Sequence, residues 1–204
     1  MSNSQEFKTN PIKERETKET SIKLALSKKD GTQEAGASTI KTGVGFLDHM
    51  LTLFAFHSGL DLYVEANGDT WVDDHHTTED IGILLGEAIR DLYTSLPSYE
   101  RYGFYFLPMD ETLSRVVLDL SGRPVCSFNA AFSREKVGTF DTELVAEFFY
   151  AVAMNSRMTL HIDLLKNGNT HHEIEGIFKG FARALAIALA PTEGGVPSTK
   201  GLIQ

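Results

Sequence analysis

Two long stretches of the chain place apolar residues at helical spacing. The first reads IGILLGEAIRDL at residues 81–92, and the second reads GIFKGFARALAIAL at residues 176–189. Apolar positions that recur every three or four residues are typical of an amphipathic helix packed on a core. The pattern therefore predicts two core-facing helices, one in each half of the chain.

Shorter segments alternate apolar and polar residues, as half-buried strands do. The alternation is clearest in LDLYVE and in MTLHID, which lie in different halves of the chain. The strands predicted in this way are Leu60–Glu65, Met158–Asp163, Ser21–Ser27, Leu113–Leu120 and Val125–Ala130.

These elements occur in the same order in both halves. A helical pattern precedes the clearest strand in each, at residues 46–57 and at residues 142–154. The chain therefore predicts an α+β fold with an internal duplication, each half-domain being a small mixed β-sheet with two helices on one face. We expect a mobile N-terminal arm at 1–14, repeats at 15–95 and 96–190, and a C-terminal loop or tail at 191–204.

Composition restricts the class of protein. The 204 residues carry a formal net charge of −9, which disfavours binding to nucleic acid or to an anionic membrane. No apolar run reaches transmembrane length, and the N-terminus lacks a signal-peptide pattern. Cys126 is the only cysteine, so no intrachain disulfide forms, and a cytoplasmic location is expected.

Each of the two long helices is expected to open with the motif HHxxE. It reads HHTTE at 75–79 and HHEIE at 171–175, and the copies lie 96 residues apart (171 − 75). On a helix the first histidine and the glutamate share a face, so imidazole and carboxylate converge on a metal ion. Adjacent histidines point about 100° apart on a helix, which favours two ions over one. The nitrogen and oxygen ligands suit Mn, Fe or Zn in a site that performs chemistry.

The repeat suggests one further ligand in each half. Pairing Leu62 with Leu160 places His49 opposite Glu147, because each lies 13 residues upstream of its leucine. The acids and amides before the motifs are interpreted mainly as helix caps. These are Asp73, Asp74, Asn167 and Asn169.

A phosphate-binding loop is predicted near the C-terminus. Residues 197–201 read PSTKG, in which hydroxyl groups and a lysine lie between proline and glycine. Arg101 and Arg123 are further candidates for anion binding. Lys179 lies one helical turn beyond Glu175 and would face the metal cations unless an anion lay between them.

Longer motifs resemble one enzyme family, imidazoleglycerol-phosphate dehydratase, from about Arg15 to Ile203. They are GFLDHM (45–50), DDHHTTED (73–80), PMDE (108–111), DLSGRP (119–124), TLHI (159–162), NTHHEIEGIFKGFARAL (169–185) and STKG (198–201). The resemblance implies the sixth step of histidine biosynthesis, in which imidazole glycerol phosphate loses water. It also implies a homo-oligomer of 24 subunits with active sites between subunits, and two Mn²⁺ per active site.

The resemblance also implies roles for individual residues. The implied metal ligands are His49, His75, His76, Glu79, His171, His172 and Glu175. Glu147 is retained as a ligand, although some members have histidine there. Glu19 is similar to the family's acid/base glutamate, and His49, His76 and Glu175 also belong to the catalytic group. The implied substrate and phosphate ligands are Arg101, Arg123, Lys179, Ser198, Lys200, His57 and Asp110. His161 is interpreted as structural or as a support for the metal ligands.

The chemistry explains the need for metals. The proton to be removed sits on a carbon with no neighbouring carbonyl, so an imidazolate must expel hydroxide and form a diazafulvene-type intermediate. Two cations at the ring nitrogens would stabilise that imidazolate, and a carboxylate would move the proton. A dinuclear metallohydrolase and a metal-stabilised shell protein remain as alternatives. Release of phosphate from the substrate without formation of a ketone would indicate the first alternative. Substitutions of the predicted phosphate-binding residues that change no measurable property would indicate the second.

Overall fold

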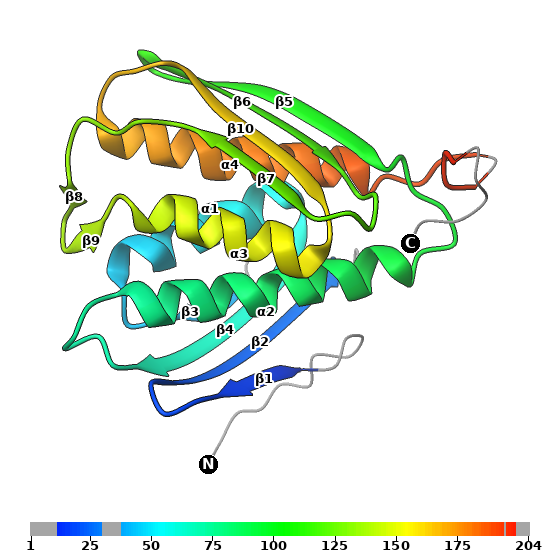
Figure 1. The fold of residues 1–204 in the computed structure, drawn as a ribbon. Coiled ribbons are helices and arrows are strands. Elements are labelled where there is room, and N and C mark those ends of the chain that lie inside the picture. Colours follow the sequence, from blue (N-terminus) through cyan, green and yellow to red (C-terminus); the bar gives the residue numbers. More distant parts are fainter. Residues whose placement is uncertain (1–11, 30–37, 194, 199–204) are drawn as a thin grey trace.

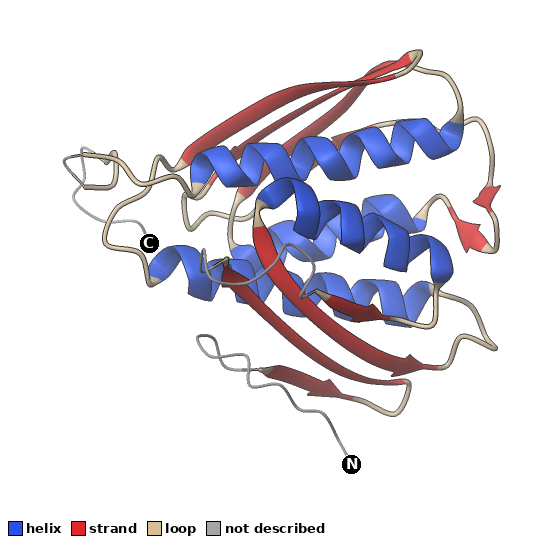
Figure 2. Cartoon of the chain, turned by 180° about the vertical axis from the view of Figure 1, so that it is seen from behind, coloured by secondary structure: helices blue, strands red, loops and turns tan. Residues whose placement is uncertain are grey.

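Two four-stranded sheets enclose a layer of helices in the computed structural model (Figure 1). It describes residues 12–29, 38–193 and 195–198. The view from behind shows the same arrangement, with strands outside and helices between them (Figure 2). Within those residues, no helix combines the length and the apolarity that a membrane crossing requires.

The first half contains four strands and two helices. In chain order these are β1 (Lys13–Glu16), β2 (Thr20–Lys28), β3 (Thr39–Lys41), α1 (Gly45–Ser58), β4 (Leu60–Gly68) and α2 (His75–Thr94). The sheet order is β1-β2-β4-β3, with β3 parallel to β4 and the other neighbours antiparallel.

The second half repeats this topology. Its elements are β5 (Tyr102–Met109), β6 (Thr112–Asp119), β7 (Val125–Asn129), β8 (Lys136–Val137), β9 (Phe140–Asp141), α3 (Leu144–Ser156), β10 (Thr159–Lys166) and α4 (Thr170–Ala188). The sheet order is β5-β6-β10-β7, and β7 is parallel to β10. The hairpin β8–β9 has no counterpart among the described residues of the first half.

Strand register confirms the predicted duplication. Leu62 lies opposite Leu26 in the first sheet, and Leu160 lies opposite Leu118 in the second. All four side chains are buried, because each points from its sheet toward the helix layer. The predicted α+β class, with two helices on one face of each sheet, is confirmed.

The helix layer joins the halves. Helix α2 packs along α3, and α1 packs along α4, so each pair contains one helix from each half. Gly82 and Gly86 permit the first pairing, since a Cβ on Gly86 would lie 2.6 Å from the Val152 carbonyl oxygen. One continuous core therefore contains buried residues from both halves.

Five of the described strands were not predicted. β1 (KERE) is charged along its whole length, β3 has three residues, and β5 (YGFYFLPM) carries aromatic residues on both faces, so none of these three shows clean alternation. β8 and β9 have two residues each, which is too short for an alternation to be visible. β1 begins at Lys13, so the last two residues of the expected arm at 1–14 belong to the first sheet. Residues 1–11 lie outside the described part of the chain. The joint between the halves spans residues 95–101.

Candidate active site

Both histidine motifs lie at helix N-termini, as predicted. His75 is the first residue of α2, and His171 is the second residue of α4. Asp73 Oδ1 accepts a hydrogen bond from the His75 amide at 2.8 Å, and Asn169 Oδ1 accepts one from the His171 amide at 2.9 Å. The bond at α4 confirms the capping interpretation for Asn169, which is the N-cap residue of that helix. The N-cap residue of α2 is Asp74, whose side chain makes no cap hydrogen bond, so the prediction was wrong there. Both helices begin at the same end of the molecule, on the left in Figure 1.

Three predicted ligands meet where α1 packs against α4. Glu175 Oε2 lies 3.2 Å from His171 Nε2 and 3.5 Å from His49 Nε2. The three ligand atoms all lie within 4.8 Å of one another, and Glu175 is 7% exposed. Two imidazole nitrogens and one carboxylate oxygen form a donor set that fits a divalent transition metal.

A cationic group adjoins this cluster. Lys179 Nζ donates a hydrogen bond to Glu175 Oε1, on the side of the carboxylate away from the histidines. Burial raises the pKa of Glu175, but the hydrogen bond and charge of Lys179, followed by His171, outweigh burial and lower it. Glu175 is therefore ionised at neutral pH, the state that binds a cation.

His57 lies near the same group. Partial burial lowers its pKa, and the charges of Lys179 and Arg183 lower it further, against an opposing effect of Glu175. His57 is consequently biased toward the neutral form. The structure thus places both His57 and Lys179 beside the His49 cluster.

The second histidine of α4 faces a different group. His172 Nδ1 lies 3.2 Å from Glu111 Oε2 and 3.7 Å from Asp110 Oδ2, and these residues form the turn between β5 and β6. The rings of His171 and His172 are 6.2 Å apart and inclined by 79°. Asp110 adopts a left-handed backbone with φ of 48°. The adjacent histidines of one motif therefore serve separate groups, as their helical spacing predicts.

The second histidine of α2 has an analogous environment. His76 Nδ1 lies 3.1 Å from Asp69 Oδ2, and His76 Nε2 lies 3.8 Å from Glu19 Oε2. Glu19 occupies the turn between β1 and β2, and its side chain is exposed. The hydrogen bond to Asp69 is the main reason why the pKa of His76 is raised. The predicted acid/base glutamate therefore lies beside a predicted metal ligand.

The remaining predicted ligands lie along the other helix pair. His75 and Glu79 are on α2, and Glu147 is exposed on α3, which packs against α2. The groups of three or more described residues that could hold a cation are His49–His171–Glu175 and Asp110–Glu111–His172. Neither contains these three residues, so a single chain does not assemble them as tightly as their counterparts on α1 and α4.

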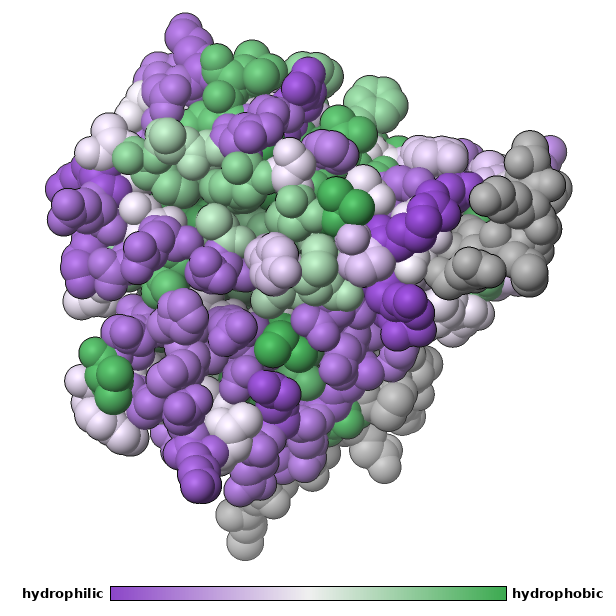
Figure 3. Space-filling view, viewed as in Figure 1, coloured by the Kyte–Doolittle hydropathy of each residue, from purple (hydrophilic) through white to green (hydrophobic). Residues whose placement is uncertain are grey.

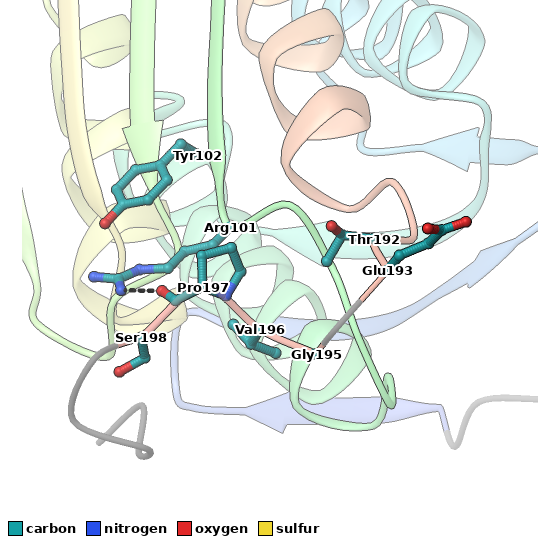
Figure 4. A pocket seen from close by; sticks show the side chains of 8 residues that line it. All are labelled: Arg101, Tyr102, Thr192, Glu193, Gly195, Val196, Pro197 and Ser198. Carbon is teal, nitrogen blue, oxygen red and sulfur yellow. Dashed lines mark hydrogen bonds between the residues drawn. The ribbon is translucent and has the colours of Figure 1, made fainter.

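Part of the predicted phosphate set surrounds a cavity of about 630 Å³ at the other end of the helices (Figure 4). Arg101 donates two hydrogen bonds to Asp119, at 2.7 and 3.1 Å, and one to the Pro197 carbonyl at 2.7 Å. Arg123 lies 3.9 Å from the same aspartate. Ser198 also lines the cavity, whereas Lys200 lies outside the described residues.

The two parts of the predicted site are far apart within one chain. The Arg101 amide donates to the Ala188 carbonyl oxygen at 3.0 Å, so Arg101 sits at the C-terminal end of α4. Thirteen residues separate Glu175 from Ala188 on this helix (188 − 175), which at 1.5 Å per residue is about 20 Å. Lys179, by contrast, lies one turn from Glu175. The structure therefore divides the predicted phosphate set between both ends of the helix layer.

One predicted residue lies away from both groups. His161 is exposed on β10, opposite Val117 on β6 and Ser127 on β7. Large apolar side chains are exposed on the same sheet, at Tyr102, Phe104, Phe106, Val117 and Val125. Figure 3 shows apolar groups gathered in the upper half of the molecule, where this sheet lies, whereas the lower half is mainly polar.

Sequence reasoning missed two carboxylates of the site, Asp69 and Glu111. Each lies in a turn that only the folded sheet brings to a histidine. The available signal was weak. Glu111 ends the PMDE motif, and Asp69 stands in a turn-forming GDT segment.

Comparisons with known proteins agree over most of the chain. The sequence model of a family described as Imidazoleglycerol-phosphate dehydratase matches residues 42–185. A protein of that name from Staphylococcus carnosus (strain TM300) is 61% identical over 193 residues, covering 94% of this chain and 98% of the relative. The crystal structure of the enzyme from Staphylococcus aureus subsp. aureus N315 is 56% identical, has a TM-score of 0.80, and covers 89% of this chain and 98% of that chain. That of IGPD from Pyrococcus furiosus in complex with (S)-C348 is 39% identical, with a TM-score of 0.79 and coverage of 93% and 99%.

Proposed function

Because the chain belongs to the imidazoleglycerol-phosphate dehydratase family and is thus a dehydratase of histidine biosynthesis, we propose that it performs this reaction at a site with two divalent metal ions. The substrate is imidazole glycerol phosphate, and the products are imidazole acetol phosphate and water. The observation that carries the metal proposal is the convergence of His49, His171 and Glu175 within 4.8 Å.

The donor atoms of the chain support two positions for the ions. His49, His171 and Glu175 would hold one, and the equivalent residues Glu147, His75 and Glu79 would contribute to the other. His76 on α2 and His172 on α4 would supply further nitrogen ligands to the two ions. The second set contains two carboxylates, which suits Mn²⁺ better than a softer metal.

Two bound cations would supply Lewis acidity at the two ring nitrogens and so stabilise an imidazolate at neutral pH. The protein then has one proton to move. Glu19, 3.8 Å from His76, would accept the proton from the chain carbon that bears the second hydroxyl group. The electron pair of that C–H bond becomes the double bond of an enol. The proton taken up by Glu19 and the hydroxide lost beside the ring together leave as water. The enol then tautomerises to the ketone.

Phosphate binding would orient the chain of the substrate for this step. Arg101, Arg123 and Ser198 supply guanidinium and hydroxyl groups near one cavity, and Lys200 follows two residues later. Lys179, one helical turn from Glu175, and His57, which interacts electrostatically with both of these residues, would face the middle of the substrate. Asp110 would approach it from the β5–β6 turn.

The separation of these groups supports a homo-oligomer with active sites between subunits. About 20 Å lies between Glu175 and Arg101 along α4, so neither end of one chain completes the site alone. The exposed aromatic face of the second sheet offers a surface that a second copy would cover. A shell of 24 subunits in the cytoplasm is consistent with this division.

The function is tested with an ultraviolet assay for the enolised ketone product. Enzyme treated with a chelator should lose activity and recover it when Mn²⁺ is added back. Phosphate should not be released, which separates dehydration from hydrolysis of the phosphoester. No recovery with any divalent metal would contradict metal dependence.

The shared site is tested by complementation. Arg101→Ala and His171→Ala each disable a different end of the chain, so each homo-oligomer should be inactive. Co-expression should restore part of the activity, because mixed oligomers contain sites with one intact end from each chain. Mass spectrometry would show that oligomers containing both variants have formed. If these mixed oligomers are inactive, the Arg101 end and the His171 end of a site come from the same subunit.

A further inference from the structure

The second histidine of each motif is held by a carboxylate at the same ring nitrogen. Asp69 lies 3.1 and 3.2 Å from His76 Nδ1, and Glu111 lies 3.2 Å from His172 Nδ1. The two carboxylates come from different elements of the duplicated fold. Asp69 directly follows β4, whereas Glu111 lies in the β5–β6 turn. Two unrelated positions thus deliver the same contact to two equivalent histidines.

An ionised carboxylate determines the tautomer of its imidazole partner. It can only accept a hydrogen bond, so Nδ1 of the neutral ring must carry the hydrogen. Nε2 then keeps its lone pair and is the ring nitrogen available to a cation. Carboxylates in this position orient metal-binding histidines in other proteins and increase their basicity.

We propose that Asp69 and Glu111 are positioning residues that aim Nε2 of His76 and His172 at the metal ions, one carboxylate for each ion. This inference rests on the proposed dinuclear site. It adds two residues that act through the metal ligands and do not themselves touch the substrate.

Glu111 is itself fixed by the fold. Its Oε1 accepts a hydrogen bond from the Asn169 amide at 2.5 Å, which ties the β5–β6 turn to the N-terminus of α4. A Cβ at Gly168 would lie 2.3 Å from this oxygen, so the close approach requires glycine there. Both oxygens of Glu111 are thus used, one on the backbone and one on His172.

Asp69 is fixed in a comparable way. It is 7% exposed, and its amide donates to the Glu19 carbonyl oxygen at 3.1 Å. The carboxylate on His76 is therefore connected to the turn that carries the proposed acid/base residue. Asp69→Asn keeps this backbone bond and changes only the group that contacts His76.

An alternative role for Glu111 is direct metal ligation, since Asp110, Glu111 and His172 could also hold a cation. Two contacts favour the positioning role. Glu111 Oε1 already accepts a hydrogen bond from the Asn169 amide. In the first half of the chain, His76 Nδ1 makes the same contact with a carboxylate, that of Asp69, which has no acidic neighbour in sequence comparable to Asp110.

The test uses Glu111→Gln and Asp69→Asn, with Glu14→Gln as the control. Glu14 is an exposed glutamate of β1 whose contact is Lys23 at 3.2 Å. Free Mn²⁺ is counted by electron paramagnetic resonance during titration of chelator-treated enzyme. Wild type and the control should bind two ions per chain tightly. Each test variant should bind one ion tightly and the other about 10- to 100-fold more weakly, and the double variant should weaken both.

A second readout separates positioning from a structural role. The protein is loaded with Co²⁺, whose visible absorption reports its ligands. Each variant should lose or shift the bands of one ion. Unchanged Mn²⁺ affinity and Co²⁺ bands, with only a lower melting temperature of the metal-free protein, would overturn the inference and leave the proposed function intact. A wild-type protein that binds no divalent metal would overturn both.

Discussion

Lys179 donates a hydrogen bond to the carboxylate of Glu175 from one helical turn away, while the other oxygen of that carboxylate faces His49 and His171. Glu175 thus lies between a fixed ammonium group and a predicted cation site. The arrangement keeps Glu175 ionised and also holds a positive charge where the anionic substrate would pass. Removing the lysine should therefore affect substrate binding more than folding.

Lys179→Met should raise KM for imidazole glycerol phosphate about tenfold or more, which corresponds to about 1.4 kcal/mol of lost binding. Methionine keeps the apolar stem but removes the charge. Lys166→Met, at the exposed end of β10, is the matched control. Steady-state kinetics at saturating Mn²⁺ measures both. An unchanged KM in the Lys179 variant would remove the lysine from the substrate site.

Glu19→Gln should reduce kcat by about 10²- to 10⁴-fold, the usual contribution of a general acid or base. Metal and substrate binding should persist, because Glu19 is an exposed turn residue 3.8 Å from the nearest histidine nitrogen. Calorimetric titration with Mn²⁺ and with substrate tests binding separately. Glu16→Gln, three residues earlier on β1, should behave as wild type. A wild-type kcat in the Glu19 variant would exclude the acid/base role.

Arg101→Lys should raise KM about tenfold, since lysine cannot reproduce the two-point contact with Asp119 and the bond to Pro197. Arg101 also has a left-handed backbone with φ of 69°, so its position is fixed by the fold. Protease cleavage near residues 192–198 should become faster because their anchor is weakened. Arg90→Lys, exposed on α2, should change neither rate nor cleavage.

Acidification should lower the free energy of unfolding of the metal-free protein, partly through protonation of His57. Its pKa is lowered in the folded state, so the unfolded chain binds more protons as pH falls below the ordinary value of 6.5. The free energy of unfolding should therefore decrease on acidification below pH 6.5. In His57→Asn this decrease should be smaller. Urea unfolding of both proteins between pH 7.5 and 5.0 measures the difference, and parallel curves would contradict the prediction.

Glu147→His should shift metal preference toward Zn²⁺. The change replaces an oxygen ligand by imidazole nitrogen, which binds later transition metals more tightly. Competition between Mn²⁺ and Zn²⁺ in chelator-treated enzyme measures the ratio of bound metals. Glu143→His, exposed and one helical turn earlier, controls for an added surface histidine. Equal metal ratios in all three proteins would argue that Glu147 is not a ligand.

The sequence predicted those parts of the site that depend on local spacing. His171 and Glu175 share a face because they are four residues apart on one helix. Leu62 and Leu160 occupy equivalent registers for the same reason. For His171 with Glu175, and for the two leucines, periodicity carries the information, since a helix or a strand converts spacing into direction. The alignment of repeats singled out His49 as a candidate ligand, whereas the packing of α1 on α4 is what brings it to Glu175.

Other contacts depend on tertiary packing and left no local signal. Glu111 reaches His172 across 61 positions of sequence, through a hairpin whose first strand was not predicted. The distance between Arg101 and Glu175 follows from the length of α4 and from where β5 begins. Neither fact is encoded in a motif, because each is set by how the second sheet lies on the helix layer.

The single core shared by both halves has a consequence for unfolding. Because α2 packs on α3 and α1 on α4, separating the repeats would expose the apolar side of every helix at once. The chain should therefore unfold in one cooperative transition, and fragments such as 15–95 should not hold their structure. The amides in the middle of α2 and α4 would then exchange hydrogen only as rarely as the whole molecule opens, whereas the exposed first-turn amides of His75 and His171 would exchange by local fraying. The ligands that begin each helix are therefore less protected than the core on which the helices rest.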